Sequence, residues 1–340
     1  MLKACDTPLW DAYDVAMLDL DGVVYIGPDA VPGVPDHLGK AAAAGMHLAY
    51  VTNNAARPPA VVAAHLRELG VPAEDHDVVT SAQAAARMLA DRLPAGSAVF
   101  VIGGAGLFEA LEERGLRPVQ ALADEPVAVV SGYHPDLAWR TISAGAVLVR
   151  RGLPWVASNT DLTVPTPDGP GPGNGVIVEA VARFADREPD VAGKPRTPLL
   201  EETLRRVGGD RPLVVGDRLD TDIEGAVAAG YDSLLVMTGV TGLDELVAAR
   251  PGSRPSYVAA DLSALGRPQP GVDADADPVR VGGWTASAAD GSLHLTGDGS
   301  ADDWWRAVAA AGWRHLDTAG SPVGTDGLTP PSSVDPDHRG

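Results

Sequence analysis

The sequence predicts an α/β protein in which a Rossmann-like parallel-sheet core is split by a large α/β insertion and followed by a small α+β module. Two observations support this fold class. Apolar runs alternate with helix-like patterns along most of the chain, which is typical of βαβ units. Stretches rich in Pro and Gly interrupt that alternation at residues 165–175 and 266–278, and they mark where one part gives way to the next.

Residues 1–80 are predicted to form the first half of the core. The run "VAML" at 15–18 and the run "HLAYVTNN" at 47–54 read as strands, separated by a helix over 34–45. The segment "PPAVVAAHLRELG" at 58–70 has prolines where a helix begins and a glycine where it ends.

Residues 81–175 are predicted to form an α/β cap domain, with the strand-like runs "AVFVIGG", "VAVVSG" and "PWVASN" separated by helices. The stretch 165–175, "PTPDGPGPGNG", holds too many Pro and Gly residues to continue a helix or strand, so we expect a loop that returns to the core. The alternation then resumes through "RPLVVGD" and "SLLVMTG", so residues 176–265 are predicted to complete the core.

The C-terminal part is predicted to be small. Residues 266–278 lack apolar periodicity and read as a linker, and residues 279–319 read as two short strands, a helix and a strand. Four of the seven tryptophans of the chain fall in that module, where large aromatic side chains are an efficient way to build a small core. Residues 320–340 are polar and rich in proline, and we expect them to be disordered.

Composition excludes several classes of function. The net charge of −20 repels phosphate backbones and anionic lipids, so neither nucleic acid nor a membrane is expected as a partner. The single cysteine, Cys5, excludes an internal disulfide and a cysteine-based metal site. With no signal-peptide pattern and no apolar run long enough for a bilayer, a reducing cytoplasm is the expected compartment.

Polar residues gather where three predicted parallel strands end. They are Asp19, Asp21, Thr52, Asn53, Asp217 and Asp222. The carboxyl ends of neighbouring parallel strands share one crevice, and several carboxylates there require a cation or raised pKa values. A hard cation such as Mg²⁺ fits this oxygen-rich set. Lys194, in "AGKPRTP" between two strand units, adds a positive charge, although a solvated surface lysine is the alternative.

Four motifs in order give the chain a family resemblance. "DLDGVVYIG", "VTNN", "GKP" and "VVGDRLDTDIEGA" resemble the four motifs of the haloacid dehalogenase (HAD) superfamily. A D-x-D-G match alone is weak evidence in a chain with so many Asp and Gly residues. The cap between the second and third motifs is similar to the NagD-like branch (subfamily IIA), which includes p-nitrophenyl, phosphoglycolate and glycerol-phosphate phosphatases. The resemblance covers about residues 9–265.

The resemblance implies a role for each motif residue. Asp19 would attack phosphorus as the nucleophile, and Asp21 would protonate the leaving oxygen and later deprotonate water. Lys194 would screen the nucleophile from the substrate dianion and, with Thr52 and Asn53, hold phosphoryl oxygens. The implied Mg²⁺ ligands are Asp19, Asp21 through its backbone carbonyl, Asp217, and Asp222 acting through water or from the second shell.

Three cap residues are further candidates by resemblance. His134 could face an anionic substrate, although a surface histidine is the simpler reading. Asn159 and Asp161 could line the closed site, although an Asx-type turn explains them almost as well. A dinucleotide-binding loop at Gly104 is not expected, because Glu109 stands where the motif needs its third glycine.

The module at 279–319 resembles a truncated part of a GNAT-type acetyltransferase. It has no R/Q-x-x-G-x-G/A loop to cradle a pyrophosphate, so we expect a stabilising or interface role.

The sequence therefore predicts a Mg²⁺-dependent phosphomonoesterase. The resemblance implies a small phosphorylated metabolite as substrate, with glycerol 3-phosphate and 2-phosphoglycolate ahead of other esters, and a homodimer through the cap as one option. Two alternatives are a phosphomutase on a sugar phosphate and a regulatory or binding protein with a vestigial phosphatase core.

Overall fold

The computed structural model describes residues 2–166, 169–273 and 276–331. The chain forms two compact units. The first comprises Met1–Leu48 and Gly209–Gly340, and the second comprises Ala49–Gly208. None of the helices in the described part of the chain is both long enough and apolar enough to cross a membrane.

The main sheet is parallel, and its strand order is β15-β14-β13-β1-β4-β5. These strands are β1 (Val15–Leu18), β4 (His47–Thr52), β5 (Val78–Thr80), β13 (Pro212–Gly216), β14 (Asp232–Val236) and β15 (Tyr257–Ala259). The boundary between the two units falls within β4. Every residue of β1 and β13 is buried, which explains why these strands are continuous apolar runs without alternation. The predicted parallel α/β fold is confirmed.

Short helices and a hairpin complete the core of the first unit. They are α1 (Leu9–Ala12), β2 (Tyr25–Ile26), β3 (Asp29–Ala30), α2 (Val34–Ala43), the π-helix η3 (Leu219–Ile223), α9 (Glu224–Ala229), α10 (Leu243–Val247), η4 (Pro251–Ser253) and η5 (Leu262–Gly266). Helix α2 begins after Gly33, whose φ of 80° lies in the left-handed region, and Pro35 occupies its first turn.

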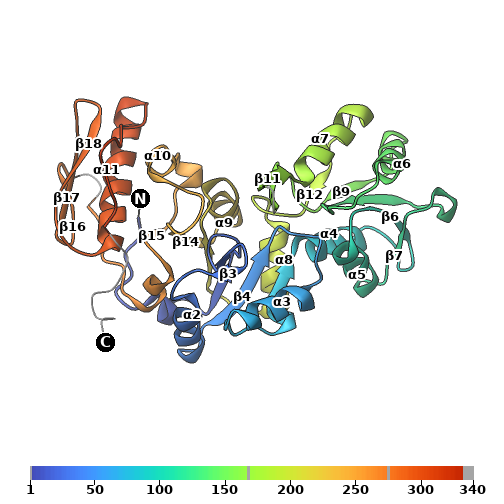
Figure 1. The fold of residues 1–340 in the computed structure, drawn as a ribbon, viewed down its shortest axis with the longest axis horizontal. Helices are drawn as coiled ribbons and strands as arrows, with labels where there is room; N and C mark the ends of the chain where they lie inside the picture. The colour runs from blue at the N-terminus through green and yellow to red at the C-terminus, as the bar shows by residue number, and fades with distance from the viewer. Residues whose placement is uncertain (1, 167–168, 274–275, 332–340) are drawn as a thin grey trace. The chain divides into compact units, whose positions relative to one another are not determined.

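The second unit contains a parallel sheet of its own, in the order β12-β9-β8-β6-β7. Its strands are β6 (Ala98–Ile102), β7 (Arg117–Val119), β8 (Ala128–Ser131), β9 (Trp155–Ala157) and β12 (Asp190–Val191). Its helices are α3 (Pro59–Glu68), η1 (Asp75–Asp77), α4 (Ser81–Ala90), α5 (Ala105–Glu113), η2 (Leu122–Asp124), α6 (Trp139–Arg150), α7 (Asn174–Ala185) and α8 (Pro198–Val207). Helices α6 and α7 share one apolar cluster with strands of this sheet (Figure 1).

The cap extends further along the chain than the boundary at residue 176 that the sequence suggested. Helix α7 packs against α6, and β12 pairs with β9, so the second sheet is completed only at Val191. The Pro/Gly-rich stretch is also not a plain loop, because β10 (Thr163–Thr166) and β11 (Gly169–Pro172) pair as an antiparallel hairpin. A two-stranded sheet leaves each strand an open edge, where a proline costs no ladder hydrogen bond.

The C-terminal module is a three-stranded antiparallel sheet followed by one long helix. Its elements are β16 (Val279–Val281), β17 (Trp284–Ala289), β18 (Ser292–Gly297) and α11 (Ala301–Ala319). Helix α11 is capped at its start by Ser300, whose hydroxyl accepts from the backbone N–H of Asp303, and at its end by Gly320 with φ of 77°. The final strand that the sequence suggested is therefore wrong, because those residues continue the helix.

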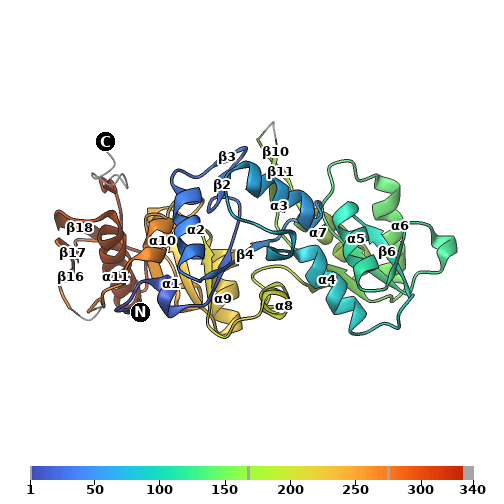
Figure 2. The same ribbon diagram turned by 90° about the horizontal axis from the view of Figure 1, so that it is seen from below.

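Helix α11 lies between the three-stranded sheet and α10 (Figures 1 and 2). Its tryptophans pack in one apolar cluster with residues of α10, β14 and β15, so the module shares its core with the parallel-sheet part of the first unit. Trp313 donates its indole N–H to the carbonyl oxygen of Leu246 at 2.7 Å, and the guanidinium of Arg254 lies 5.3 Å from its ring centre.

The segments expected to be linker and tail also make specific contacts. The backbone of Gln269 exchanges two hydrogen bonds of 2.7 Å with Cys5. Val323 is buried, and the backbone N–H of Leu293 donates to Gly324. Residues 320–331 thus depart from the expected disorder, while the rest of the predicted tail, residues 332–340, lies outside the described residues.

The N-terminal segment is joined to the sheet by a polar cluster around Asp232 at the start of β14. Its carboxylate accepts hydrogen bonds from Tyr13 at 2.8 Å and Ser256 at 2.9 Å, and it pairs with Lys3 at 2.6 Å. Burial alone would raise the pKa of Asp232, but these three donors outweigh it and hold the pKa below its usual value.

We expect Asp232→Asn to lower the free energy of unfolding at pH 7 by about 1–3 kcal/mol, because it weakens charge-assisted hydrogen bonds. A lowered folded-state pKa stabilises the protein above the unfolded-state pKa of about 3.9, and this contribution disappears as the pH falls through the folded-state value. The difference between variant and wild type, measured by urea unfolding, should therefore shrink below about pH 4. If the free energies of unfolding of variant and wild type differed by the same amount at pH 7 and below about pH 4, this account would be contradicted. Asp36→Asn, which changes an exposed carboxylate, is the control.

We expect Trp313→Ala to destabilise the first unit by about 3–5 kcal/mol, because it leaves a cavity in the cluster shared by α11 and the core. Thermal unfolding followed by circular dichroism would measure the effect. A loss of α11 alone, with the rest of the unit melting as in wild type, would show instead that the module folds independently.

Candidate active site

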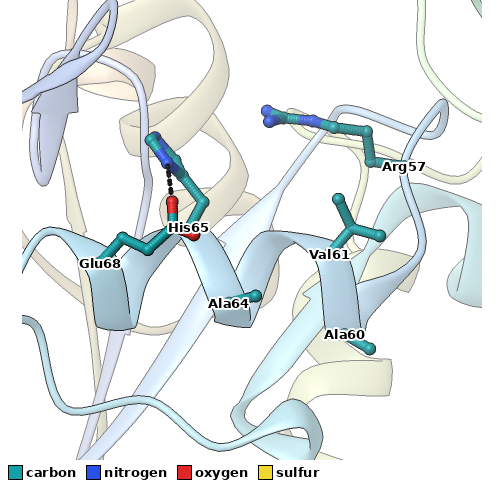
Figure 3. Close-up of a pocket in the computed structure, with 6 residues that line it drawn as sticks. All are labelled: Arg57, Ala60, Val61, Ala64, His65 and Glu68. Atoms are coloured by element: carbon teal, nitrogen blue, oxygen red, sulfur yellow. Dashed lines mark ion pairs between the residues drawn. The ribbon is translucent and has the colours of Figure 1, made fainter.

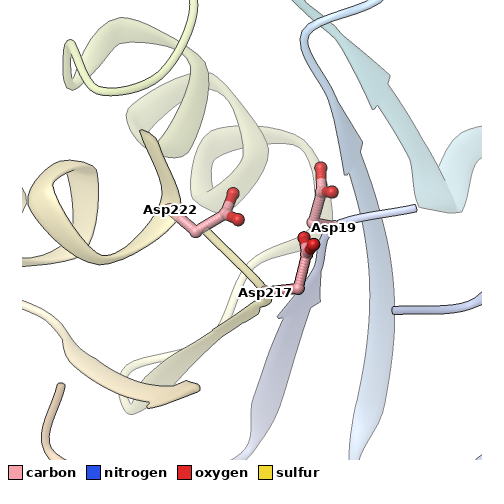
Figure 4. Close-up of side chains that lie close together, drawn as sticks. All are labelled: Asp19, Asp217 and Asp222. Atoms are coloured by element: carbon pink, nitrogen blue, oxygen red, sulfur yellow. The ribbon is translucent and has the colours of Figure 1, made fainter. Parts of the chain in front are cut away.

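Three aspartates meet at the carboxyl ends of adjacent strands β1 and β13. Asp19 follows β1 directly, and its backbone N–H donates to Val215 of β13 at 2.8 Å. Asp217 follows β13, and Asp222 lies on the π-helix η3 just beyond it. One carboxylate oxygen from each aspartate lies within 4.8 Å of the other two (Figure 4). Asp217 and Asp222 are both at least 99% buried, whereas Asp19 is partly exposed.

Glycines make the room that these carboxylates occupy. A Cβ atom at Gly22, where φ is 87°, would lie 2.5 Å from Oδ2 of Asp217, and one at Gly239 would overlap the same oxygen. A Cβ atom at Gly216 would overlap the side chain of Asp222. The glycine that follows "DLD" in the sequence is therefore required by two constraints, a left-handed backbone and the close approach of a carboxylate.

Backbone N–H groups orient two of the three carboxylates. Val240 donates to Oδ2 of Asp217 at 2.7 Å, and Arg218 donates to Oδ2 of Asp222 at 3.1 Å. Asp21 stands apart from the cluster: its side chain is exposed, and its backbone forms a β-bridge with Tyr25. The carboxyl of Asp21 thus has access to solvent that the carboxyls of Asp217 and Asp222 lack.

This donor set fits a divalent cation. Three aspartate oxygens within 4.8 Å of one another repel strongly when ionised, and a cation is the ordinary way to hold such a group in place. Carboxylate oxygens are hard ligands, which suit Mg²⁺, Ca²⁺ or Mn²⁺ rather than a softer metal.

A second group of predicted site residues lies in the second unit, around Asn53 and Lys194. Lys194 is only 3% exposed, and its ammonium group donates to the carbonyl oxygen of Val51 at 3.3 Å. The amide oxygen of Asn53 accepts from the backbone N–H of Lys194 at 2.8 Å, and its amide nitrogen donates to the carbonyl oxygen of Lys194 at 3.0 Å. The same nitrogen lies 3.1 and 3.2 Å from the two carboxylate oxygens of Asp161.

Asn159 and Asn174 extend this polar group. Asn159 donates to the carbonyl oxygen of Asn53 at 2.7 Å, and its own amide oxygen accepts from the backbone N–H of Asp161 at 3.1 Å. The second of these bonds is the Asx-type turn that the sequence left open. Asn174, at the start of α7, donates to the carbonyl oxygen of Asn159 at 2.7 Å. Sequence reasoning missed Asn174, and its only signal was an asparagine between two glycines, which usually marks a turn.

Thr52 and His134 lie outside that polar group in the described contacts. The hydroxyl of Thr52 accepts from the backbone N–H of Asn54 at 3.0 Å. The imidazole of His134 accepts from the backbone N–H of Asp136 at 3.2 Å, and it lies where a Cβ atom at Gly104 would be. The close approach of the His134 ring therefore explains why a glycine stands at position 104.

A pocket on helix α3 is not part of either group. It is lined by Arg57, Ala60, Val61, Ala64, His65 and Glu68 (Figure 3). The ion pair between His65 and Glu68, at 3.9 Å, is its one pair of opposite charges among the residues drawn. The pocket lining contains neither the carboxylate cluster nor a predicted site residue.

Comparison with known proteins agrees with the motifs. A model for haloacid dehalogenase-like hydrolases matches residues 16–117, and a HAD-hydrolase-like model matches residues 191–265. The chain is 40% identical, over 310 residues, to D-glycerol 3-phosphate phosphatase of Mycobacterium tuberculosis, covering 88% of this chain and 86% of the relative. It is 34% identical to acid sugar phosphatase of Staphylococcus aureus, over 74% of this chain and 96% of the relative.

Solved structures give the same picture. The glycerol phosphate phosphatase of M. tuberculosis in complex with magnesium is similar with a TM-score of 0.82 and 38% identity, over 93% of this chain and 94% of that one. The same enzyme in complex with calcium is similar with a TM-score of 0.81 and 38% identity, over 96% of this chain and 93% of that one. Because residues 1–265 make up only about four fifths of the chain, the similarity extends into the C-terminal module.

The fold and the acid cluster define a metal-assisted hydrolase of the α/β class. The chain belongs to the haloacid dehalogenase-like hydrolase family, in its NagD-like phosphatase branch. The predicted family and enzyme class are confirmed. Both family models end before the C-terminal module, and its resemblance to an acetyltransferase stays a prediction.

The acid cluster predicts that a divalent cation stabilises the folded protein. We expect a saturating concentration of Mg²⁺ to raise the melting temperature by several degrees, since a ligand at 100 times its Kd contributes about 2.7 kcal/mol. Asp217→Asn should remove most of that rise, whereas Asp220→Asn, on the exposed side of the same segment, should leave it intact. An equal rise in all three proteins would show that the cation binds elsewhere.

Proposed function

We propose that this phosphatase hydrolyses a small phosphomonoester, with glycerol 3-phosphate as the first candidate, in a Mg²⁺-dependent reaction. The observation that carries the proposal is the cluster of Asp19, Asp217 and Asp222 at the carboxyl ends of β1 and β13, with two of the three carboxylates buried. The relative at 40% identity is named for glycerol 3-phosphate, and that name supports the substrate. 2-Phosphoglycolate is the second candidate.

The proposed reaction has two steps. In the first, a carboxylate oxygen of Asp19 forms a bond to phosphorus while the bond to the leaving oxygen breaks, and Asp21 gives that oxygen its proton. In the second, Asp21 takes a proton from a water molecule whose oxygen attacks phosphorus, which releases phosphate and restores Asp19. An aspartate nucleophile is already ionised at neutral pH and needs no base to activate it.

The remaining residues position charge. We assign Lys194 and Thr52 to the phosphoryl oxygens, Lys194 as a buried ammonium group that offsets the charge of the ester. Asp19, Asp217, Asp222 and the backbone carbonyl of Asp21 would hold Mg²⁺, which supplies charge neutralisation for the phosphoryl group. His134 remains a candidate for contact with the leaving group.

The single cysteine supports a reducing compartment, and we propose the cytoplasm. Dimerisation through the cap is proposed from the family resemblance alone.

We expect Asp19→Asn to reduce phosphate release at least about 10³-fold without changing the melting temperature by much, because it removes the nucleophile at nearly constant volume. Release would be measured from glycerol 3-phosphate, 2-phosphoglycolate and p-nitrophenyl phosphate, with Mg²⁺ and with EDTA. The ester with the highest kcat/KM identifies the substrate class. Asp36→Asn, on an exposed helix face, is the control for loss of one carboxylate.

Residual activity within tenfold of wild type in Asp19→Asn would refute the nucleophile. Isomerised ester without free phosphate would favour the phosphomutase, and no reaction of any ester would favour a binding role.

A further inference from the structure

The side-chain amide of Asn53 is saturated by protein partners. An asparagine side chain offers one oxygen acceptor and two N–H donors. Here the oxygen accepts from the backbone N–H of Lys194 at 2.8 Å, while the donors reach the carbonyl oxygen of Lys194 at 3.0 Å and the carboxylate of Asp161 at 3.1 Å. The amide therefore has no donor left for a phosphoryl oxygen.

The orientation of this amide follows from its neighbours. The backbone N–H of Lys194 can only donate, so the amide atom facing it must be the oxygen. The other amide atom faces a carbonyl oxygen and a carboxylate, which can only accept, so it must be the nitrogen. A rotation of the amide by 180° would place like groups together on all sides.

The surroundings of Asn53 are built for this contact. A Cβ atom at Gly193 would lie 2.6 Å from the amide oxygen of Asn53, so the glycine beside Lys194 lets the amide reach the backbone. The carbonyl oxygen of Asn53 in turn accepts from Ser81 and from Asn159. Asn53 is thus fixed by its own backbone and, through its side chain, fixes the main chain of a residue 141 positions away.

We propose that Asn53 is a positioning residue that holds the main chain of Lys194, so that the lysine ammonium group is presented to the phosphoryl group in one place. The proposal rests on the catalytic role proposed above for Lys194. It replaces the sequence expectation that Asn53 itself binds phosphate. Asp161 acts through the same amide. Its carboxylate accepts the second N–H of Asn53, and this bond fixes the orientation in which the amide contacts Lys194.

A double-mutant cycle with p-nitrophenyl phosphate and Mg²⁺ tests the proposal. Asn53→Ala should lower kcat roughly 10- to 100-fold, the range for residues that orient a catalytic group, while KM changes less than about threefold. In the Lys194→Ala background, Asn53→Ala should lower kcat by less than about a further threefold, because the ammonium group that Asn53 positions is already absent. Losses that multiply in the double variant, or a large rise in KM and in the inhibition constant of inorganic phosphate, would overturn the proposal and make Asn53 a phosphate ligand.

A second variant guards against a folding defect. Asp161→Asn keeps the volume of the side chain but removes the charged acceptor, so it should lower kcat by a smaller factor and also lose its effect in the Lys194→Ala background. An effect of Asp161→Asn that persists in that background would overturn the proposal even if Asn53→Ala fails to fold. Gln120→Ala is the matched control, because the amide of Gln120 also bonds a distant backbone carbonyl, that of Val101 at 3.1 Å, and its loss should leave kcat unchanged.

The outcomes separate this proposal from the function on which it rests. A wild-type protein that releases no phosphate from any ester refutes the proposed function and the positioning role with it. An active wild type with independent losses at Asn53 and Lys194 refutes the positioning role alone.

Discussion

The constraint on which the first unit depends is the close approach of three carboxylates, two of them buried, at the ends of two adjacent strands. Uncompensated, such a group would cost several kcal/mol for each charge removed from water. The chain meets this cost with backbone donors to Asp217 and Asp222, and with an arrangement of oxygens that suits a cation. The same constraint also explains two glycines in the sequence. The side chain of Asp217 leaves no room for a Cβ atom at position 22 or at position 239.

Local pattern was enough to predict the parallel sheet and the acids at its edge. Buried parallel strands are continuous apolar runs, and the residues that follow them are brought together by the sheet, so Asp19 and Asp217 could be related without a structure. The cap boundary could not be read in this way. The pairing of β12 with β9 joins residues far apart in the chain, and a two-residue strand such as Asp190–Val191 has no period to detect.

The C-terminal module illustrates a second limit. Its composition indicated a small aromatic core, and Trp304, Trp305 and Trp313 are buried. The sequence did not indicate which other elements these side chains pack against. Trp313 packs and hydrogen-bonds against α10 and is covered by Arg254, so the aromatic cluster serves to join the module to the parallel-sheet part of the unit. A tryptophan-rich segment therefore predicts burial well, and says little about what it is buried against.

The contact between Asn53 and Lys194 shows why an amide is needed at that position. The main chain of one residue, here Lys194, presents an N–H donor and a carbonyl acceptor, and of the short polar side chains only an amide offers an acceptor and a donor on separate atoms to meet both. An aspartate at position 53 could accept from the N–H of Lys194, but it could not donate to the carbonyl oxygen and would repel Asp161. A serine offers a single oxygen atom for both tasks, so it cannot match the N–H and the carbonyl oxygen with separate atoms. In the motif "VTNN", Asn53 looks in sequence like a ligand for phosphate. Its contact with the main chain of Lys194 is by itself enough to require an asparagine at this position.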